Sequence, residues 1–124
     1  MTENENIAVV TDFIEAWSRL DADELASYFT EDGCYHNMPT KPVTGRKEVR
    51  DMIAGFTAGW TETHWDLLNI AGAGDVVFAE RLDRTKLGDN GVDLPCTGVF
   101  EMEGGKIKVW RDYFDMGTFM KAMS

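Results

Sequence analysis

Apolar and polar side chains alternate along the stretch VVFAERLDRTKL, residues 76–87. Side chains two positions apart lie on the same face of a β-strand. One face of this stretch therefore carries Val77, Ala79, Arg81 and Asp83. The alternation predicts a strand, and it leaves open which face is directed toward the core.

Glycine-rich breaks on both sides of this stretch divide the second half of the chain into further strands. Glycines cluster at residues 72–74, 88–91 and 104–105, where tight turns are expected. Between these turns the pattern predicts strands over residues 63–71, 76–87, 92–103 and 106–114. Such short connections join consecutive strands into an antiparallel meander.

The first half of the chain has helical periodicity instead. Apolar residues recur with helical spacing over residues 7–20, which predicts a first helix there. Asp21, followed by Glu24 three residues later, resembles a capping box and predicts a brief second helix. The apolar face of this second helix would be formed by Leu25, Tyr28 and Phe29.

Two more helical segments are expected. The first follows Gly45, ends near Gly59 and has the apolar stripe Val49, Met52, Ile53 and Phe56. The second is a last helical turn, capped by Asp115 and carrying Phe119 and Met120. Helices followed by hairpins predict an α+β domain, in which helices pack on one face of a curved sheet and leave a concavity between the two layers. The 124 residues fit one domain, spanning residues 1–124.

Composition and charge exclude several classes of partner. The chain has 12 Lys and Arg against 22 Asp and Glu, a net charge of −10 that repels nucleic acid and anionic lipid surfaces. No apolar run approaches the length of a membrane span, and the acidic N-terminus is unlike an export signal. Cys34 and Cys96 lack metal-ligand spacing and are expected to be small buried thiols in a reducing cytoplasm.

One charged residue of the last predicted strand is flanked by aromatic side chains. Asp112 shares a face with Trp110 and Phe114, and a buried carboxylate in such surroundings needs a partner. Arg81 is the natural candidate, and Asp83 on the same face can share its guanidinium. Tyr35 and Asn37 would align a hydroxyl and an amide if residues 33–37 are extended. Spacing alone leaves open whether these five residues form a catalytic site or a structural salt-bridge cluster.

Three motifs, taken in order, resemble those of the limonene-1,2-epoxide hydrolase family. They are YHNMP at residues 35–39, RLD at residues 81–83 and WRDYFD at residues 110–115, and the resemblance covers most of the chain. The resemblance implies the cystatin-like, nuclear-transport-factor-2-like fold, with a strongly curved mixed or antiparallel sheet that forms a cone-shaped pocket.

The resemblance also implies roles for individual residues. Asp83 matches the family's general acid, Arg81 its bridging arginine and Asp112 its general base, while Tyr35 and Asn37 match the groups that help to hold the water. The expected reaction adds water to a small apolar epoxide, such as a terpene or cycloalkene oxide, and gives a vicinal diol in one step. Two aspartates that retain one proton between them can supply the acid and the base.

The remaining expectations concern ligands and partners. The pocket wall is expected to include Trp110, Phe114, Met38 and Met116. We expect no cofactor and no metal, because no His-Glu-x-x-His or Cys-x-x-Cys pattern is present, and we expect His36 and His64 to be structural or exposed. The exposed face of the sheet is expected to pair two copies into a homodimer.

Two rival hypotheses use the same scaffold. A ketosteroid-isomerase-like or polyketide-cyclase-like enzyme would move a proton next to a carbonyl with one aspartate base. A non-catalytic module that binds a small molecule would have the same fold. Arg81 between two carboxylates favours the divided acid and base of an epoxide hydrolase over the first rival, and turnover would exclude the second.

Overall fold

The computed structural model describes residues 2–123 as six strands and four α-helices, with one short 3₁₀ turn. In chain order the elements are α1 (Glu3–Ala16), the 3₁₀ turn (Trp17–Arg19), α2 (Ala22–Ala26), β1 (Phe29–Asn37), β2 (Val43–Thr44), α3 (Arg46–Thr57), β3 (Glu62–Ala73), β4 (Val76–Leu87), β5 (Asn90–Glu103), β6 (Lys106–Phe114) and α4 (Met116–Met123). The predicted α+β class is confirmed.

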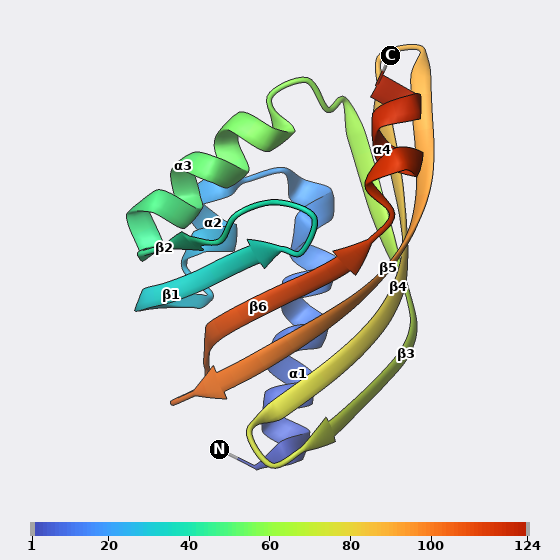
Figure 1. Ribbon diagram of the computed structural model, residues 1–124. Coiled ribbons are helices and arrows are strands. Elements are labelled where there is room, and N and C mark those ends of the chain that lie inside the picture. The colour runs from blue at the N-terminus through green and yellow to red at the C-terminus, as the bar shows by residue number, and fades with distance from the viewer. Residues whose placement is uncertain (1, 124) are drawn as a thin grey trace.

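All six strands form one mixed sheet in the order β2-β1-β6-β5-β4-β3 (Figure 1). Strands β3 to β6 are joined by consecutive antiparallel pairings, as the glycine-rich turns predicted. Gly74, Gly88 and Gly104 have positive φ angles at these turns, a conformation that glycine adopts without steric cost. β1 adds to the edge of β6 in a parallel pairing, which converts the meander into a mixed sheet.

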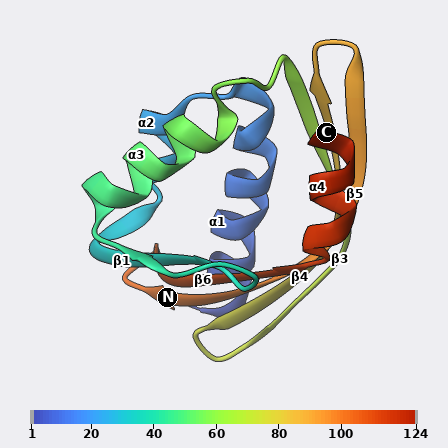
Figure 2. The same cartoon turned by 45° about the horizontal axis from the view of Figure 1, so that its top comes forward.

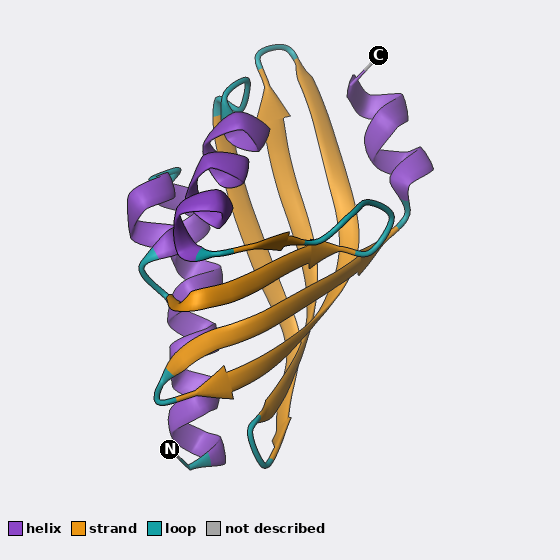
Figure 3. Ribbon diagram, turned by 60° about the vertical axis from the view of Figure 1, so that its left-hand side comes forward, coloured by secondary structure: helices purple, strands orange, loops and turns teal. Residues whose placement is uncertain are grey.

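The helices α1, α2 and α3 lie on one side of the sheet, and α4 lies beside β5 at the end where the β4–β5 hairpin projects (Figure 2). Figure 3 shows the two layers from the side. The sheet twists along its strands but is not strongly curled, so the expectation of a strongly curved sheet was wrong in degree. The long strands β3 to β5 pair through regular ladders over most of their length, which favours twist over closure into a cone.

Two helix boundaries differ from the predicted ones. The first helix begins at Glu3 rather than near Ile7, because Thr2 and Glu5 form a reciprocal capping box. The second helix is as brief as predicted and Asp21 caps it. It ends at Ala26, however, and Phe29 already belongs to β1.

An aromatic core joins α1 to the centre of the sheet. The ring of Phe13 lies edge-on to Trp110, with 5.1 Å between the ring centroids, and Trp17 stacks on Trp65 at 4.2 Å. Trp110 also stacks on Tyr35 at 4.2 Å, nearly parallel to it. This packing covers the inner face of the sheet, where the polar residues identified in the sequence lie on β1, β4 and β6. No helix within residues 2–123 is long and apolar enough to cross a membrane.

Candidate active site

Strand parity places the charged residues on the inner face of the sheet. Along β4 the burial pattern alternates, and Arg81 and Asp83 fall on the buried side, with exposed fractions of 0% and 6%. Asp112 on β6 is 3% exposed. The sequence pattern left open which face of this strand is directed toward the core, and the structure shows that it is the face that carries Arg81 and Asp83.

The Arg81 guanidinium bridges the two carboxylates. Its Nε and Nη2 donate to the two oxygens of Asp83 at 3.0 and 2.8 Å. Its Nη1 and Nη2 donate to the two oxygens of Asp112 at 2.8 and 2.9 Å. Each carboxylate is thus held through both of its oxygens, in the forked geometry that only arginine offers.

Tyr35 and Asn37 lie next to Asp112 across the parallel pairing of β1 with β6. Asn37 is the register partner of Asp112, and Tyr35 is the partner of Trp110. Both side chains are buried. All five predicted site residues therefore lie in one region of the structure.

Burial raises the pKa of two side chains of this cluster, Asp83 and Tyr35. Loss of hydration raises the pKa of Asp83 above its ordinary value, although the charge of Arg81 acts in the opposite direction. Burial likewise raises the pKa of Tyr35 well above that of an exposed tyrosine, so its hydroxyl stays protonated. One guanidinium and two ionised carboxylates would bury a net charge of −1, and one retained proton makes the cluster neutral.

Two residues of β3 that were not predicted from the sequence, Thr63 and Trp65, support the cluster. The Trp65 ring lies under the Arg81 guanidinium, 4.4 Å from ring centroid to Cζ, a cation–π contact. Trp65 Nε1 donates to Thr63 Oγ1 at 3.0 Å, and Thr63 Oγ1 lies 2.7 Å from Thr85 Oγ1. The alternation of Thr63 and Trp65 on one face of their strand was the available signal.

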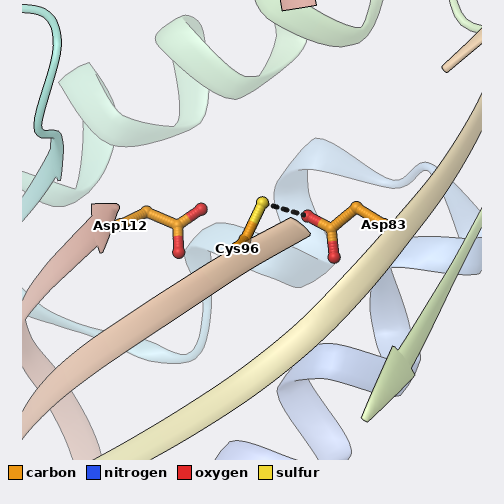
Figure 4. Close-up of side chains that lie close together, drawn as sticks. All are labelled: Asp83, Cys96 and Asp112. Atoms are coloured by element: carbon orange, nitrogen blue, oxygen red, sulfur yellow. Dashed lines mark hydrogen bonds between the residues drawn. The ribbon is translucent and has the colours of Figure 1, made fainter. Parts of the chain in front are cut away.

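Two residues of β5 also contact the cluster. The Cys96 thiol donates to Asp83 Oδ2 at 3.4 Å, and it lies between the two aspartates (Figure 4). Gly98 lies beneath the guanidinium, where a Cβ atom would come within 3.0 Å of Arg81 Nη1. The cysteines are free thiols, as expected, although Cys34 is only half-buried.

Asp83, Cys96 and Asp112 offer ligand atoms within 4.8 Å of one another, close enough to hold a metal ion. The Arg81 cation already engages all four carboxylate oxygens, and burial raises the pKa of the Cys96 thiol well above its usual range. A divalent cation would have to compete with a buried guanidinium, so this donor set suits proton chemistry better.

The two histidines lie apart from the cluster. His36 Nε2 is 2.9 Å from the Thr40 carbonyl oxygen. His64 is exposed and its Nε2 lies 2.9 Å from Asp66 Oδ1. These positions agree with the structural or exposed roles expected for them.

A small cavity opens beside the two aspartates. Its volume is about 20 Å³, room for about one water molecule. Its lining includes Tyr35, Asn37, Asp83, Cys96, Asp112 and Phe114, together with Phe56 of α3 and Phe119 of α4. Phe56 and Phe119 stack with 5.6 Å between their centroids, and both also line a neighbouring groove of about 420 Å³. The stacked rings therefore lie between the small cavity and the larger groove.

The predicted wall residues have different positions. Phe114 lines both the cavity and the groove, and Met116 lines the groove. Trp110 is fully buried in the aromatic core, behind the aspartates. Met38 is half-buried and lies outside the residues that line these two hollows.

A family model and a known enzyme each match most of this chain. Residues 4–124 match the family model of the limonene-1,2-epoxide hydrolase catalytic domain. Epoxide hydrolase EphG of Mycobacterium tuberculosis (strain ATCC 25618 / H37Rv) is 28% identical over 111 residues, which cover 90% of this chain and 74% of EphG.

Solved structures extend the comparison to the fold. The structure of an LEH-like epoxide hydrolase of M. tuberculosis is 27% identical and has a TM-score of 0.84, covering 97% of this chain and 90% of that one. A protein with a ketosteroid-isomerase-like fold from Catenulispora acidiphila has a TM-score of 0.83 at 21% identity, over 92% of this chain and 90% of that one. The second likeness concerns the fold alone.

Proposed function

This chain belongs to the limonene-1,2-epoxide hydrolase family, and we propose that it adds water to a small apolar epoxide in one step, with Asp83 and Asp112 as acid and base. The observation that carries the proposal is the buried guanidinium of Arg81, which holds both carboxylates through two hydrogen bonds each. The product is a vicinal diol.

Opening an epoxide requires a proton on its oxygen as water attacks carbon, because the oxygen would otherwise leave as a poor alkoxide. Asp83, whose pKa burial raises, supplies that proton. Asp112 accepts a proton from the attacking water while the bond from water oxygen to carbon forms and the ring bond from carbon to oxygen breaks. The pair ends with its proton on Asp112, and transfer back to Asp83 restores the starting state.

The water has a place beside these groups. The cavity of about 20 Å³ next to Asp112 has the volume of about one water molecule, and Tyr35 and Asn37 line it. Their hydroxyl and amide groups orient the water toward the reacting carbon, a gain in proximity and alignment. Arg81 stabilises whichever carboxylate is ionised.

The substrate is a small apolar epoxide of the terpene or cycloalkene oxide kind. The lining of the groove next to the cavity includes five large apolar side chains, Met52, Phe56, Phe114, Met116 and Phe119, which offer apolar surface. The polar residues Asn37, Thr40, Lys41 and Asp51 complete much of the rest of the lining. Only the epoxide oxygen and the attacked carbon need to reach the polar cluster.

Two substitutions test the acid and base roles. Asp83→Asn and Asp112→Asn each remove proton transfer and keep the shape of the side chain, so kcat should fall by about 10²-fold or more. Circular dichroism and thermal unfolding check that each variant is folded, and diol formation from a panel of epoxides is the readout. Near-normal turnover by either folded variant would exclude that residue from the mechanism.

A single-turnover reaction in ¹⁸O-labelled water distinguishes the one-step route from a covalent one. Direct attack by water places the label in the diol during the first turnover. A covalent ester would first place the label in an aspartate carboxyl and release unlabelled diol. A β,γ-unsaturated ketone serves as a second substrate, because its isomerisation would indicate the ketosteroid-isomerase type of chemistry.

A further inference from the structure

We propose that Cys96 is a positioning residue for Asp83. The thiol hydrogen of Cys96 turns between the Asp83 carboxylate and the Leu94 carbonyl as Asp83 loses and regains its proton. This inference rests on the proposed function, because it assigns a step to the acid of that reaction. It concerns the orientation of one S–H bond, which stays intact throughout.

The thiol lies within reach of two acceptors at once. Cys96 Sγ is 3.4 Å from Asp83 Oδ2 and 3.4 Å from the carbonyl oxygen of Leu94. A thiol has a single hydrogen, so it can donate to only one of these oxygens at a time. Both distances are ordinary for a sulfur donor, and rotation about one side-chain bond exchanges the two partners.

The position of Cys96 follows from strand register. On β5 it is the partner of Arg81 on β4 and of Phe114 on β6, so its side chain projects inward between the strands that carry the two aspartates. Figure 4 shows the sulfur between Asp112 and Asp83, with its hydrogen bond to Asp83. The side chain is 4% exposed and lines the small cavity.

The state of Asp83 decides which acceptor is preferred. An ionised carboxylate is a stronger acceptor than a peptide carbonyl, so the thiol donates to Asp83 once the acid has given its proton to the epoxide oxygen. Neutral Asp83 is a weaker acceptor, and the thiol then turns to the Leu94 carbonyl. The thiol thus stabilises the acid in its ionised state and eases release of its proton.

Other groups around Asp83 act on the same equilibrium. Arg81 of β4 favours the ionised form, Asp112 of β6 disfavours it, and Tyr35 of β1 remains protonated and neutral. Burial raises the pKa of Cys96 itself, so the side chain stays a thiol that can donate. The contribution of Cys96 adds to the larger one of Arg81.

The pH dependence of kcat/KM tests the inference. Activity is lost at high pH when the aspartate pair gives up its retained proton. Removing a donor to the ionised form raises that pKa, so Cys96→Ala should move the alkaline limb upward by about half a pH unit. Cys96→Ser restores a hydroxyl donor and should move the limb back toward or below the wild-type position.

A matched variant controls for loss of packing. Val92 is a buried residue of the same strand and lines the same cavity, and none of its side-chain atoms can donate to Asp83. Val92→Ala should change stability and KM but leave the alkaline limb in place. An unmoved limb in Cys96→Ala, or an equal shift in Val92→Ala, would overturn the inference.

Two spectroscopic readouts do not depend on turnover. Carbon-13 NMR of labelled aspartate, assigned with Asp83→Asn, should show Asp83 titrating at higher pH in Cys96→Ala than in the wild type. In a Cys34→Ser background the S–H stretching band of Cys96 should shift as Asp83 ionises, and a band that is constant with pH would contradict a change of acceptor.

These measurements separate the two proposals. An active, folded Asp83→Asn protein would overturn the proposed function, whatever the NMR titration shows. An inactive Asp83→Asn protein together with an unmoved Asp83 titration in Cys96→Ala would leave the proposed function in place and overturn the role of Cys96.

Discussion

At the scale of single residues, the cluster depends on a position without a side chain. A Cβ atom on Gly98 would lie 2.8 Å from Trp110 Nε1 and 3.0 Å from Arg81 Nη1. Because both neighbours are fully buried, Gly98→Ala should displace the guanidinium, lower kcat by about tenfold or more and cost about 1–3 kcal/mol of stability. Steady-state kinetics and thermal unfolding measure the two effects.

Gly59→Ala is the matched control for Gly98→Ala. A Cβ atom at Gly59 would meet no atom within 4 Å, and the residue is exposed. Both quantities should therefore stay close to those of the wild type. If Gly98→Ala behaved like this control, the close approach of β5 would not set the position of Arg81.

The raised pKa of Asp83 has a consequence for stability. The folded protein keeps a proton on this carboxyl at pH values where the unfolded chain has lost it. The associated stability is fully present below the unfolded pKa, near 3.9, and is lost as the pH rises through the folded pKa. Asparagine cannot ionise, so Asp83→Asn should gain stability relative to the wild type as the pH rises.

Chemical denaturation of both proteins between about pH 4 and pH 8 measures this difference. Surface carboxylates titrate alike in the two proteins, so subtraction isolates the proton that Asp83 shares with Asp112. A stability difference that stayed constant, or that shrank with rising pH, would indicate that the pKa of Asp83 is not raised in the folded state.

Local sequence indicated some contacts of the cluster and not others. Arg81, Asp83 and Asp112 could be grouped because strand parity is local and because an aspartate among aromatic residues needs a partner. The contacts of Cys96 and Gly98 depend on the register between β4, β5 and β6, which no short segment encodes. Residues that contact the cluster only through the register between neighbouring strands were therefore not predicted as site residues.

At the scale of secondary-structure elements, α3 and α4 each place one aromatic ring between the small cavity and the neighbouring groove. Phe56 and Phe119 stack at 5.6 Å, and the cavity behind them holds about 20 Å³, far less than an epoxide of terpene size. These rings must separate for substrate to reach the aspartates. Phe119→Ala should raise kcat/KM for bulky epoxides relative to small ones by about tenfold, because one ring of the stack is removed.

Met120→Ala tests whether the effect belongs to this face of α4. Met120 is the next residue along the helix and is 57% exposed. Its truncation should leave the ratio of kcat/KM values for large and small epoxides unchanged. Equal ratios in the wild type and Phe119→Ala would show that the aromatic stack does not limit access.

The way in which the elements are connected explains which of them could be predicted from the sequence. Hairpins have a local sequence pattern, in which glycine-rich turns separate stretches of alternating apolar and polar residues. Strands β3 to β6 were therefore predicted to within a few residues. The parallel pairing of β1 with β6 connects distant segments without a turn, so only the extended state of residues 33–37 could be expected. The early start of α1 depended on a capping box in a segment without apolar periodicity.

At the scale of the whole molecule, the outer face of the sheet carries exposed aromatic residues on a strongly acidic protein. Phe78 and Tyr113 are each 45% exposed, and Phe78 pairs across the strands with Val99. Exposed apolar surface of this kind is typical of protein interfaces. We therefore propose that two copies pair through this face.

The oligomeric state tests this pairing directly. Light scattering coupled to size-exclusion chromatography should give a mass near twice the chain mass of 13.9 kDa. Phe78→Glu should give a mass near that of one chain, because a twofold axis brings like surfaces together and would bury two new carboxylates close to each other. Met120→Glu adds the same charge on α4, away from the sheet face, and should leave the dimer intact.

A single-chain mass for the wild type would contradict the pairing, and a dimer that survived Phe78→Glu would place the interface on another surface. Because the proposed catalytic cluster lies on the opposite face of the sheet, a monomeric Phe78→Glu protein should still hydrolyse epoxide at near the wild-type rate.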